Sequence, residues 1–224
     1  MNKRSIFISA VLLVLTVTIH GQNKFNRELS VGGSLGMGVS TVSFVPDIKT
    51  NYLLGTHFGF TGRWITENHL GLILEMNYSQ QGWDEKFDDT SLQYTRKINF
   101  IDIPFLTHIY FGGKRVRFFV NLGPKIGFAI SESTTNNLPK DFEESMDIRV
   151  QKLHGKPIEK KFAWGVGGGP GIEIRTGVGN FLLEGRYFYG LGDLFNNRRD
   201  DPFPQSSSQL IMGKLTYLIP IKRK

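Results

Sequence analysis

The sequence predicts an all-β fold: a closed antiparallel eight-stranded transmembrane β-barrel, built as an up-and-down meander. Three observations predict it. Apolar side chains recur at every second position in eight segments, the connections between these segments alternate between long and short, and ionisable side chains stand in the middle of the polar faces. The length of 224 residues fits one domain, because single all-β domains commonly reach this size.

Composition excludes several other classes of protein. Hydrophobic residues make up 40% of the chain and charged residues 21%, which rules out a disordered tail and a polytopic helical membrane protein. The absence of Cys excludes disulfides, thiolate metal sites and an acylated-cysteine anchor. The chain is instead rich in Gly (26 residues) and Phe (18 residues).

The first residues have the order of a secretory leader. Lys3 and Arg4 precede an apolar run from Ile6 to Ile19, and small or polar residues follow. The run is shorter than the ~20 residues that an uncleaved helical anchor needs. We therefore expect a signal peptide over residues 1–21, removed on export, and a short N-terminal segment over residues 22–28.

The net charge does not indicate a nucleic-acid partner. Removal of Lys3 and Arg4 with the leader lowers the formal charge from +7 to about +5, and residues 222–224 form a basic C-terminal tail. The other cations are scattered among acids, and an exported chain rarely meets nucleic acid.

The barrel is expected over residues 29–221. In its first strand the apolar residues Leu29, Val31, Leu35, Met37 and Val39 alternate with Ser and Gly, which gives a strand with two distinct faces. The same period returns in seven further segments, in order 54–64, 70–78, 101–111, 118–130, 162–174, 181–191 and 211–221.

The connections alternate in length. The long ones are 44–52, 81–97, 132–160 and 192–207, and the short ones are 67–69, 112–115 and 177–179. Brief periplasmic turns and long extracellular loops are typical of outer-membrane barrels. A helical turn is expected near Asp141–Val150 in the third long loop.

The polar faces predict a closed lumen filled by side chains. They carry ionisable groups of both signs that can neutralise one another across a narrow interior, and eight strands leave just enough room for side chains. Inward Phe119, Leu182 and Phe188 would plug a channel, so an open pore is not expected. The predicted luminal polar network comprises Arg63, Glu75, Asp102, Arg117, Lys125, Glu173, Arg175, Glu184, Arg186 and Lys214, and Lys161 is placed on the same face.

Aromatic residues on the opposite faces predict belts at the two membrane interfaces. They are Trp64, Tyr78, Trp164, Tyr187, Tyr189 and Tyr217. The glycine-rich run 165–171 is expected to spare room inside the barrel, because it lacks the Gly-Lys-Ser/Thr and the helix of a phosphate-binding loop.

His57 and Asp102 are the remaining candidates for chemistry. Both are expected to point into the lumen near the loop end, where a His could activate a Ser hydroxyl for acyl transfer in a lipid-modifying enzyme. No Ser is singled out by the sequence, and a luminal His beside an acid is more often a member of a polar network. Neither a metal nor a cofactor is expected, since His69 and His154 lack a metal-like spacing with His57 or His108.

Several segments resemble the eight-stranded outer-membrane barrel family of Bacteroidetes, often labelled porin family or PorT-like. They are Gly71–Gly82, Ile98–Phe111, Phe119–Ser131 and Phe181–Leu191, and the likeness covers nearly all of the mature chain. The resemblance implies an outer-membrane barrel without a single activity, and one branch of the family is linked to type IX protein secretion. Such barrels usually end on an aromatic residue, whereas this chain ends on Lys224, so Tyr217 is the expected substitute.

The sequence thus favours a non-enzymatic outer-membrane barrel of a Gram-negative cell, with a structural or interaction role in the envelope. The long loops are expected outside the cell and the termini in the periplasm. Expected partners are outer-membrane lipid and lipopolysaccharide, the barrel-insertion machinery and other envelope or secretion proteins. A PorT-like component of type IX secretion and a lipid-modifying enzyme that uses His57 stay open as alternatives.

Overall fold

The computed structural model describes residues 27–45, 48–87, 91–154, 156–195 and 205–223. The predicted signal peptide lies outside these residues. Eight long strands form the wall of the molecule: β1 (Glu28–Val45), β3 (Leu53–Glu67), β4 (Leu70–Glu85), β5 (Tyr94–Gly112), β6 (Val116–Asn136), β7 (Phe162–Arg175), β8 (Asn180–Asp193) and β9 (Gln205–Arg223). A two-residue strand, β2 (Thr50–Asn51), pairs with β4.

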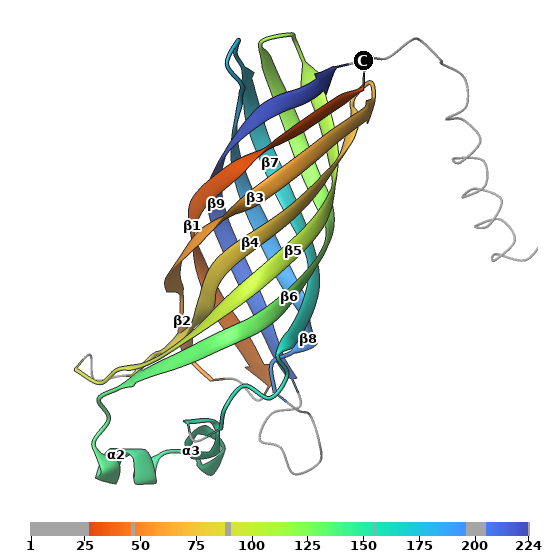
Figure 1. Cartoon of the computed structure of the whole chain (residues 1–224). Helices are drawn as coiled ribbons and strands as arrows, with labels where there is room; N and C mark the ends of the chain where they lie inside the picture. Colours follow the sequence, from red (N-terminus) through yellow and green to blue (C-terminus); the bar gives the residue numbers. More distant parts are fainter. Residues whose placement is uncertain (1–26, 46–47, 88–90, 155, 196–204, 224) are drawn as a thin grey trace, which may run out of the picture.

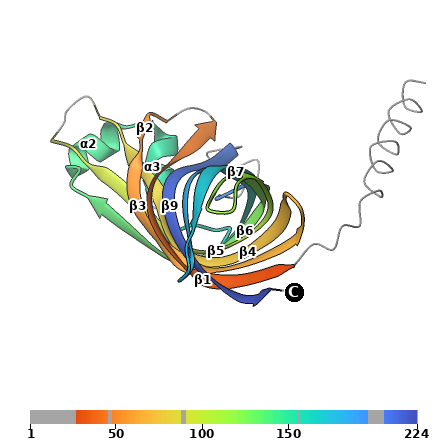
Figure 2. The ribbon, with the colours of Figure 1, turned by 90° about the horizontal axis from the view of Figure 1, so that it is seen from above.

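The eight strands close into a ring, which confirms the predicted fold class. Each strand pairs antiparallel with the next along the chain, and β1 pairs with β9 from Glu28↔Arg223 to Val45↔Gln205. The ribbons run obliquely around a common axis (Figure 1), and the ring is seen from its end in Figure 2. Because the ring is closed, each of these eight strands has a paired neighbour on both sides.

The two faces of the wall differ in polarity, as the alternation predicted. Apolar side chains on the outside are exposed, for example Phe60 at 76% and Leu35 at 64%, whereas the polar residues between them are buried. A row of exposed Phe, Leu and Ile is stable only against another apolar phase, so this outer face is built for lipid. The part of the chain that the structure describes contains no helix long and apolar enough to cross a membrane.

The short connections, the first residues of β1 and the last residues of β9 lie at one end of the barrel (Figure 1). We call this the turn end. The opposite loop end carries two short helices, α2 (Lys140–Ser145) and α3 (Ile148–His154), in place of the single helical turn expected there.

The strands are longer than predicted at the loop end. β1 continues to Val45, β4 to Glu85 and β6 to Asn136, and β5 begins at Tyr94 inside a segment that was expected to be a loop. The prediction failed there because polar residues occur on both faces, so the alternation ends before the pairing does. At the other end β1 includes Glu28 and β9 runs to Arg223, so the strands extend beyond both predicted barrel limits.

Several glycines permit close approach between neighbouring strands. A Cβ built on Gly169 would lie 1.8 Å from the carbonyl oxygen of Gly185 on β8, whereas a Cβ on Gly185 would meet nothing within 4 Å. Gly169 therefore permits the close approach of β8, and Gly171 leaves room inside the barrel for the ring of Phe119, which is the role that the sequence indicated for this run.

We expect Gly169→Ala to lower the free energy of unfolding by about 2 kcal/mol, because the backbone of β7 or β8 must move to admit the methyl group. The matched variant Gly185→Ala should change it by less than about 0.5 kcal/mol. Urea titration in detergent micelles, followed by tryptophan fluorescence, measures both. Equal effects of the two variants would argue against the tight contact at Gly169.

Candidate functional site

The turn end of the lumen holds a cluster of ion pairs. This turn-end cluster consists of Glu28, Arg63, Glu173 and Arg175, which come from β1, β3 and β7. Arg63 bridges Glu173 at 2.9 Å and Glu28 at 3.2 Å, and Arg175 donates to the other carboxylate oxygen of Glu28. Arg117 lies beside the cluster, 4.0 Å from Glu173 and 4.5 Å above the ring of Tyr110.

A second cluster lies farther along the lumen toward the loop end. This central cluster consists of Glu75, Glu184, Arg186 and Lys214. Both terminal nitrogens of Arg186 bond Glu75 at 2.8 Å, and its Nε donates to Glu184 at 2.6 Å. Lys214 reaches Glu75 at 2.6 Å. With two anions and two cations the cluster is neutral, which is the condition under which charges persist in a desolvated interior.

Nearer the loop end Lys125 pairs with Asp102 at 3.3 Å. Asp102 also accepts hydrogen bonds from Ser79 at 2.6 Å and Gln81 at 2.9 Å. The ten residues of the predicted network therefore all lie in the lumen: nine belong to the two clusters and this pair, and Arg117 lies beside the turn-end cluster. Lys161 does not: it precedes β7 and is exposed.

Apolar side chains fill the lumen around the charged groups. They form two buried clusters. The first comprises Ile65, Tyr110, Phe119, Leu182 and Leu218. The second comprises Ile73, Leu106, Phe188, Leu210 and Met212. Lys125 lies 5.2 Å from the ring centroid of Phe188, so ionic and apolar levels are in contact. The interior is occupied by side chains rather than left open.

His57 stands at the level of Ser79, which is its partner in the β3–β4 register. Ser79 donates to Asp102, and neither ring nitrogen of His57 makes a hydrogen bond to any residue that the structure describes. His57 and Asp102 are thus near one level of the lumen, as expected, but no hydrogen-bonded His–Ser arrangement exists there.

The loop end is closed by an apolar group of side chains that sequence reasoning missed. This outer plug comprises Val42, Phe44, Trp83, Ile98, Phe100, Leu153, Ile158, Leu194 and Phe195. Arg96 lies 5.7 Å from the ring of Trp83 and 5.6 Å from that of Phe195, and it donates to the carbonyl oxygens of Leu153 and Lys156. Arg96 therefore holds the end of α3 against the barrel.

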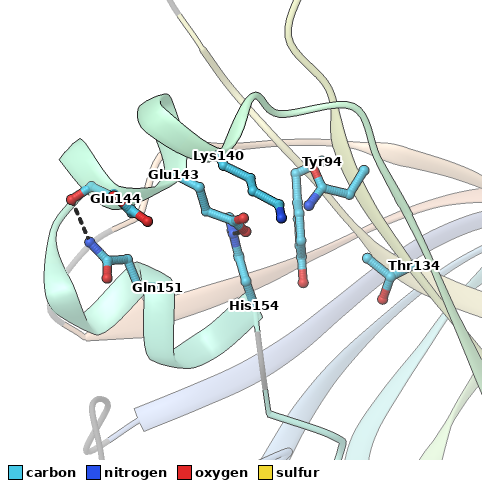
Figure 3. A pocket seen from close by; sticks show the side chains of 8 residues that line it. Tyr94, Thr134, Lys140, Glu143, Glu144, Gln151 and His154 are labelled. Carbon is cyan, nitrogen blue, oxygen red and sulfur yellow. Dashed lines mark hydrogen bonds and ion pairs between the residues drawn. The ribbon is translucent and has the colours of Figure 1, made fainter.

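A cavity of about 480 Å³ lies between the outer parts of β5 and β6 and the two helices. Its lining residues are Tyr94, Thr134, Asn136, Lys140, Glu143, Glu144, Gln151 and His154 (Figure 3). His154 stacks on Tyr94 with the ring centroids 3.7 Å apart, and its two nitrogens contact Glu143 at 3.1 Å and Glu85 at 3.0 Å. Burial is the main reason that the pKa of Tyr94 is raised, so its hydroxyl stays neutral in the cavity wall.

Glu28 and Arg96 are two of the buried charged residues that the sequence interpretation did not place in the lumen. Glu28 was assigned to the segment before the barrel, and Arg96 to a loop. Each nevertheless continues the inward alternation of its strand, Glu28 with Ser30 and Arg96 with Ile98. Extending the predicted strands toward the N-terminus would have found both, by one residue before Leu29 for Glu28 and by five residues before Ile101 for Arg96.

The predicted interfacial aromatics all lie on the outer side of the wall. Trp64 and Tyr217 are near the turn end, where the Tyr217 hydroxyl donates to the Val178 carbonyl at 2.6 Å. Tyr78, Trp164, Tyr187 and Tyr189 lie nearer the loop end. Their contact with lipid headgroups stays a prediction. Among the described residues no group of three or more His, Cys, Asp or Glu side chains could hold a metal ion.

We expect Glu75→Gln to lower the free energy of unfolding by about 3–5 kcal/mol, since Lys214 and Arg186 would then share one carboxylate in a desolvated interior. The matched variant Glu159→Gln, in a partly exposed pair with Lys156 at 3.0 Å, should cost less than about 1 kcal/mol. Urea titration in micelles checks both. Similar costs at the two sites would mean that the central cluster is hydrated rather than buried.

Comparison with known proteins identifies one family. Residues 20–196 match the family described as outer membrane protein beta-barrel domain. No curated protein matches the sequence.

Solved structures with a similar fold include three outer-membrane proteins. Ail of Yersinia pestis is 14% identical, with 86% of this chain and 99% of that chain covered and a TM-score of 0.43. Neisserial surface protein A is 11% identical, with 84% of this chain and 96% of that chain covered and a TM-score of 0.45. OprG of Pseudomonas aeruginosa is 13% identical, with 89% of this chain and 95% of that chain covered and a TM-score of 0.44.

Proposed function

Because the chain belongs to the outer membrane protein β-barrel domain family and is an integral outer-membrane barrel, we propose that it is a non-conducting, non-enzymatic component of the cell envelope. Its role is structural or in interaction with other molecules. The long loops face the outside of the cell and the turn end faces the periplasm, in keeping with the usual lengths of connections in such barrels. Lipid and lipopolysaccharide surround the wall.

The filled lumen is the observation that carries this proposal. The turn-end cluster, the central cluster and the Asp102–Lys125 pair follow one another along the axis, and two buried apolar clusters share the lumen with them. The outer plug then closes the loop end. An ion that entered would have to displace paired charges and packed rings, so the fixed interior favours a scaffold over a channel.

The lipid-enzyme alternative has less support. His57 is only 5% exposed and lacks a hydrogen-bonded Ser among the described residues, whereas acyl transfer requires a nucleophile within reach of its base. The loop end offers a polar cavity and exposed segments on a rigid barrel, which is where binding residues concentrate. These features support an interaction role.

A PorT-like role in type IX secretion is the finer form of the proposal and rests on the family resemblance of the barrel wall. A deletion strain would then retain its secreted cargo proteins inside the cell. Normal release of cargo from that strain would remove the secretion role and leave the general envelope role.

We expect no discrete conductance steps from the purified barrel in planar bilayers. A variant in which a short Gly/Ser linker replaces residues 139–158 should also be silent, because the luminal clusters remain after α2 and α3 are removed. A general porin recorded in the same bilayers is the positive control. Reproducible steps from either form of the protein would contradict a filled lumen.

A further inference from the structure

Basic residues follow the lipid-facing wall at the turn end. Arg27 lies two residues before Leu29, and Lys114 and Arg115 directly precede Val116. Leu29 and Val116 are exposed apolar side chains at the turn-end edge of the outer wall, so the three cations stand just beyond that edge. All three are exposed, and none of them forms an ion pair with a residue that the structure describes.

These cations form two groups on opposite sides of the ring. Arg27 belongs to the β1–β9 junction, where β9 ends with Lys222 and Arg223 in register with the start of β1. Lys114 and Arg115 belong to the short turn between β5 and β6. Strands β3 and β4 separate the two groups on one side of the ring, and β7 and β8 separate them on the other.

Acids offset these cations only in part. The turn-end cluster is itself neutral, and Arg117 beside it adds a positive charge. Glu67, which ends β3, is the one exposed acid at the turn end of the described chain, and it forms no ion pair there. The β7–β8 turn, residues 176–179, carries no charged side chain. The described turn end therefore has an excess of positive charge.

The loop-end edge of the same wall is different. Its outward polar side chains are neutral and bond one another. Thr56 donates to Gln80 at 3.1 Å. Asn99 donates to Ser131 at 2.8 Å. Farther out, side chains of both signs are mixed: Lys97, Lys140, Lys161, Glu132, Glu143 and Glu144. Basic residues without acids among them are thus a feature of the turn-end edge.

An anionic lipid headgroup is the ligand that fits both basic groups. The cations begin where the apolar wall ends, at the level of Trp64, and this is the headgroup level around an integral membrane barrel. A compact ligand cannot contact cations on opposite sides of the barrel, whereas the surrounding layer of lipid reaches both. Lys and Arg side chains at this level are attracted to anionic headgroups, and zwitterionic headgroups lack the net charge for that attraction.

We propose that the turn end binds anionic glycerophospholipid, with Lys114 and Arg115 as one contact and Arg27 as the other. The inference deepens the proposed function, because it names the lipid and rests on a turn end that faces the periplasm. The periplasmic leaflet of an outer membrane is built of phospholipid, and lipopolysaccharide occupies the opposite leaflet. The ammonium and guanidinium groups contact the headgroup phosphate, and the acyl chains lie along the wall beside Val116.

Lipid titration tests the ligand. Short-chain phosphatidylglycerol is added to the full chain in phosphocholine micelles, and the amide signals of residues 27–29 and 113–116 are followed by NMR. The signals should shift to saturation, and the affinity should fall as salt rises from about 50 mM to about 500 mM, because salt screens exposed charges. Phosphatidylcholine of the same chain length should bind at least about fivefold more weakly. Equal binding of the two lipids would overturn the proposal.

Two double variants test the location. Lys114→Gln with Arg115→Gln removes two charges at the turn end, and Lys97→Gln with Lys161→Gln removes two exposed charges at the loop end. The first variant should lose at least about threefold in phosphatidylglycerol affinity at residues 113–116, and the second should bind like the wild type. Equal losses would mean that net charge alone attracts the lipid and would contradict a turn-end site.

Arg27→Gln tests the second contact separately. The response of residues 27–29 to phosphatidylglycerol should fall, and that of residues 113–116 should stay as in the wild type, because the two groups lie on opposite sides of the ring. Mobility in unheated gels shows that each variant is folded. Loss of both responses in the folded Arg27 variant would contradict two independent contacts.

Other occupants would give different results. A peptide of Glu residues, which stands for an acidic segment of a periplasmic protein, should leave the signals of residues 113–116 unchanged. A response to the peptide as strong as that to phosphatidylglycerol would make an acidic protein segment the occupant and overturn the proposal.

Cysteine labelling in cells tests which leaflet supplies the lipid. Val178→Cys places a single thiol at the exposed tip of the β7–β8 turn. A membrane-impermeant maleimide should label it only after the outer membrane is permeabilised. Labelling in intact cells would place the turn end at the lipopolysaccharide leaflet and overturn the choice of phospholipid.

The proposed function fails on a different measurement. Ionic conductance of the wild type would overturn the closed lumen and leave the lipid preference intact. Equal binding of the two lipids would overturn the lipid site and leave a silent lumen intact. The two failures are therefore distinguishable.

Discussion

The structure depends on one constraint: within hydrocarbon, every main-chain N–H and C=O group needs a partner inside the protein. A sheet with two open edges cannot meet it, so β9 must return to β1. The register that joins them runs the full length of both strands. Once the ring is closed, each strand has one face toward lipid and one toward the axis, and the residues of the two faces must differ accordingly.

The narrow axis then determines what the inner face can contain. Charges are admitted where they neutralise one another, as Arg186 does between Glu75 and Glu184. The remaining volume is taken by rings such as Phe119 and Phe188, and by glycines where strands approach closely. The wall is thus rigid and closed. Residues that recognise molecules outside the cell are therefore expected at the loop end, where the strands extend beyond the ring.

The part of the fold that faces lipid could be predicted from the sequence, because lipid imposes a strict alternation on residues such as Leu29 and Val31. Beyond the apolar belt that alternation fades. The outer parts of β5 and β6, with Arg96 and Thr134, have polar groups on both faces and were assigned to loops. Pairing partners such as Glu28 with Arg175 are far apart in sequence, so only the closed ring reveals them. The outer plug depends on loop residues such as Leu153 and Phe195 that carry no periodic signal.

Ring closure can be tested directly with an introduced cysteine pair, since the chain has no cysteine of its own. Val39 and Ile211 face each other across the β1–β9 junction, and partners in an antiparallel pair lie about 4.5–5.5 Å apart, within reach of a disulfide. Val39→Cys with Ile211→Cys should form an intramolecular disulfide in the outer membrane, and Val39→Cys with Leu215→Cys should not. Failure of the first pair, or equal bonding by the second, would contradict a closed barrel with this register.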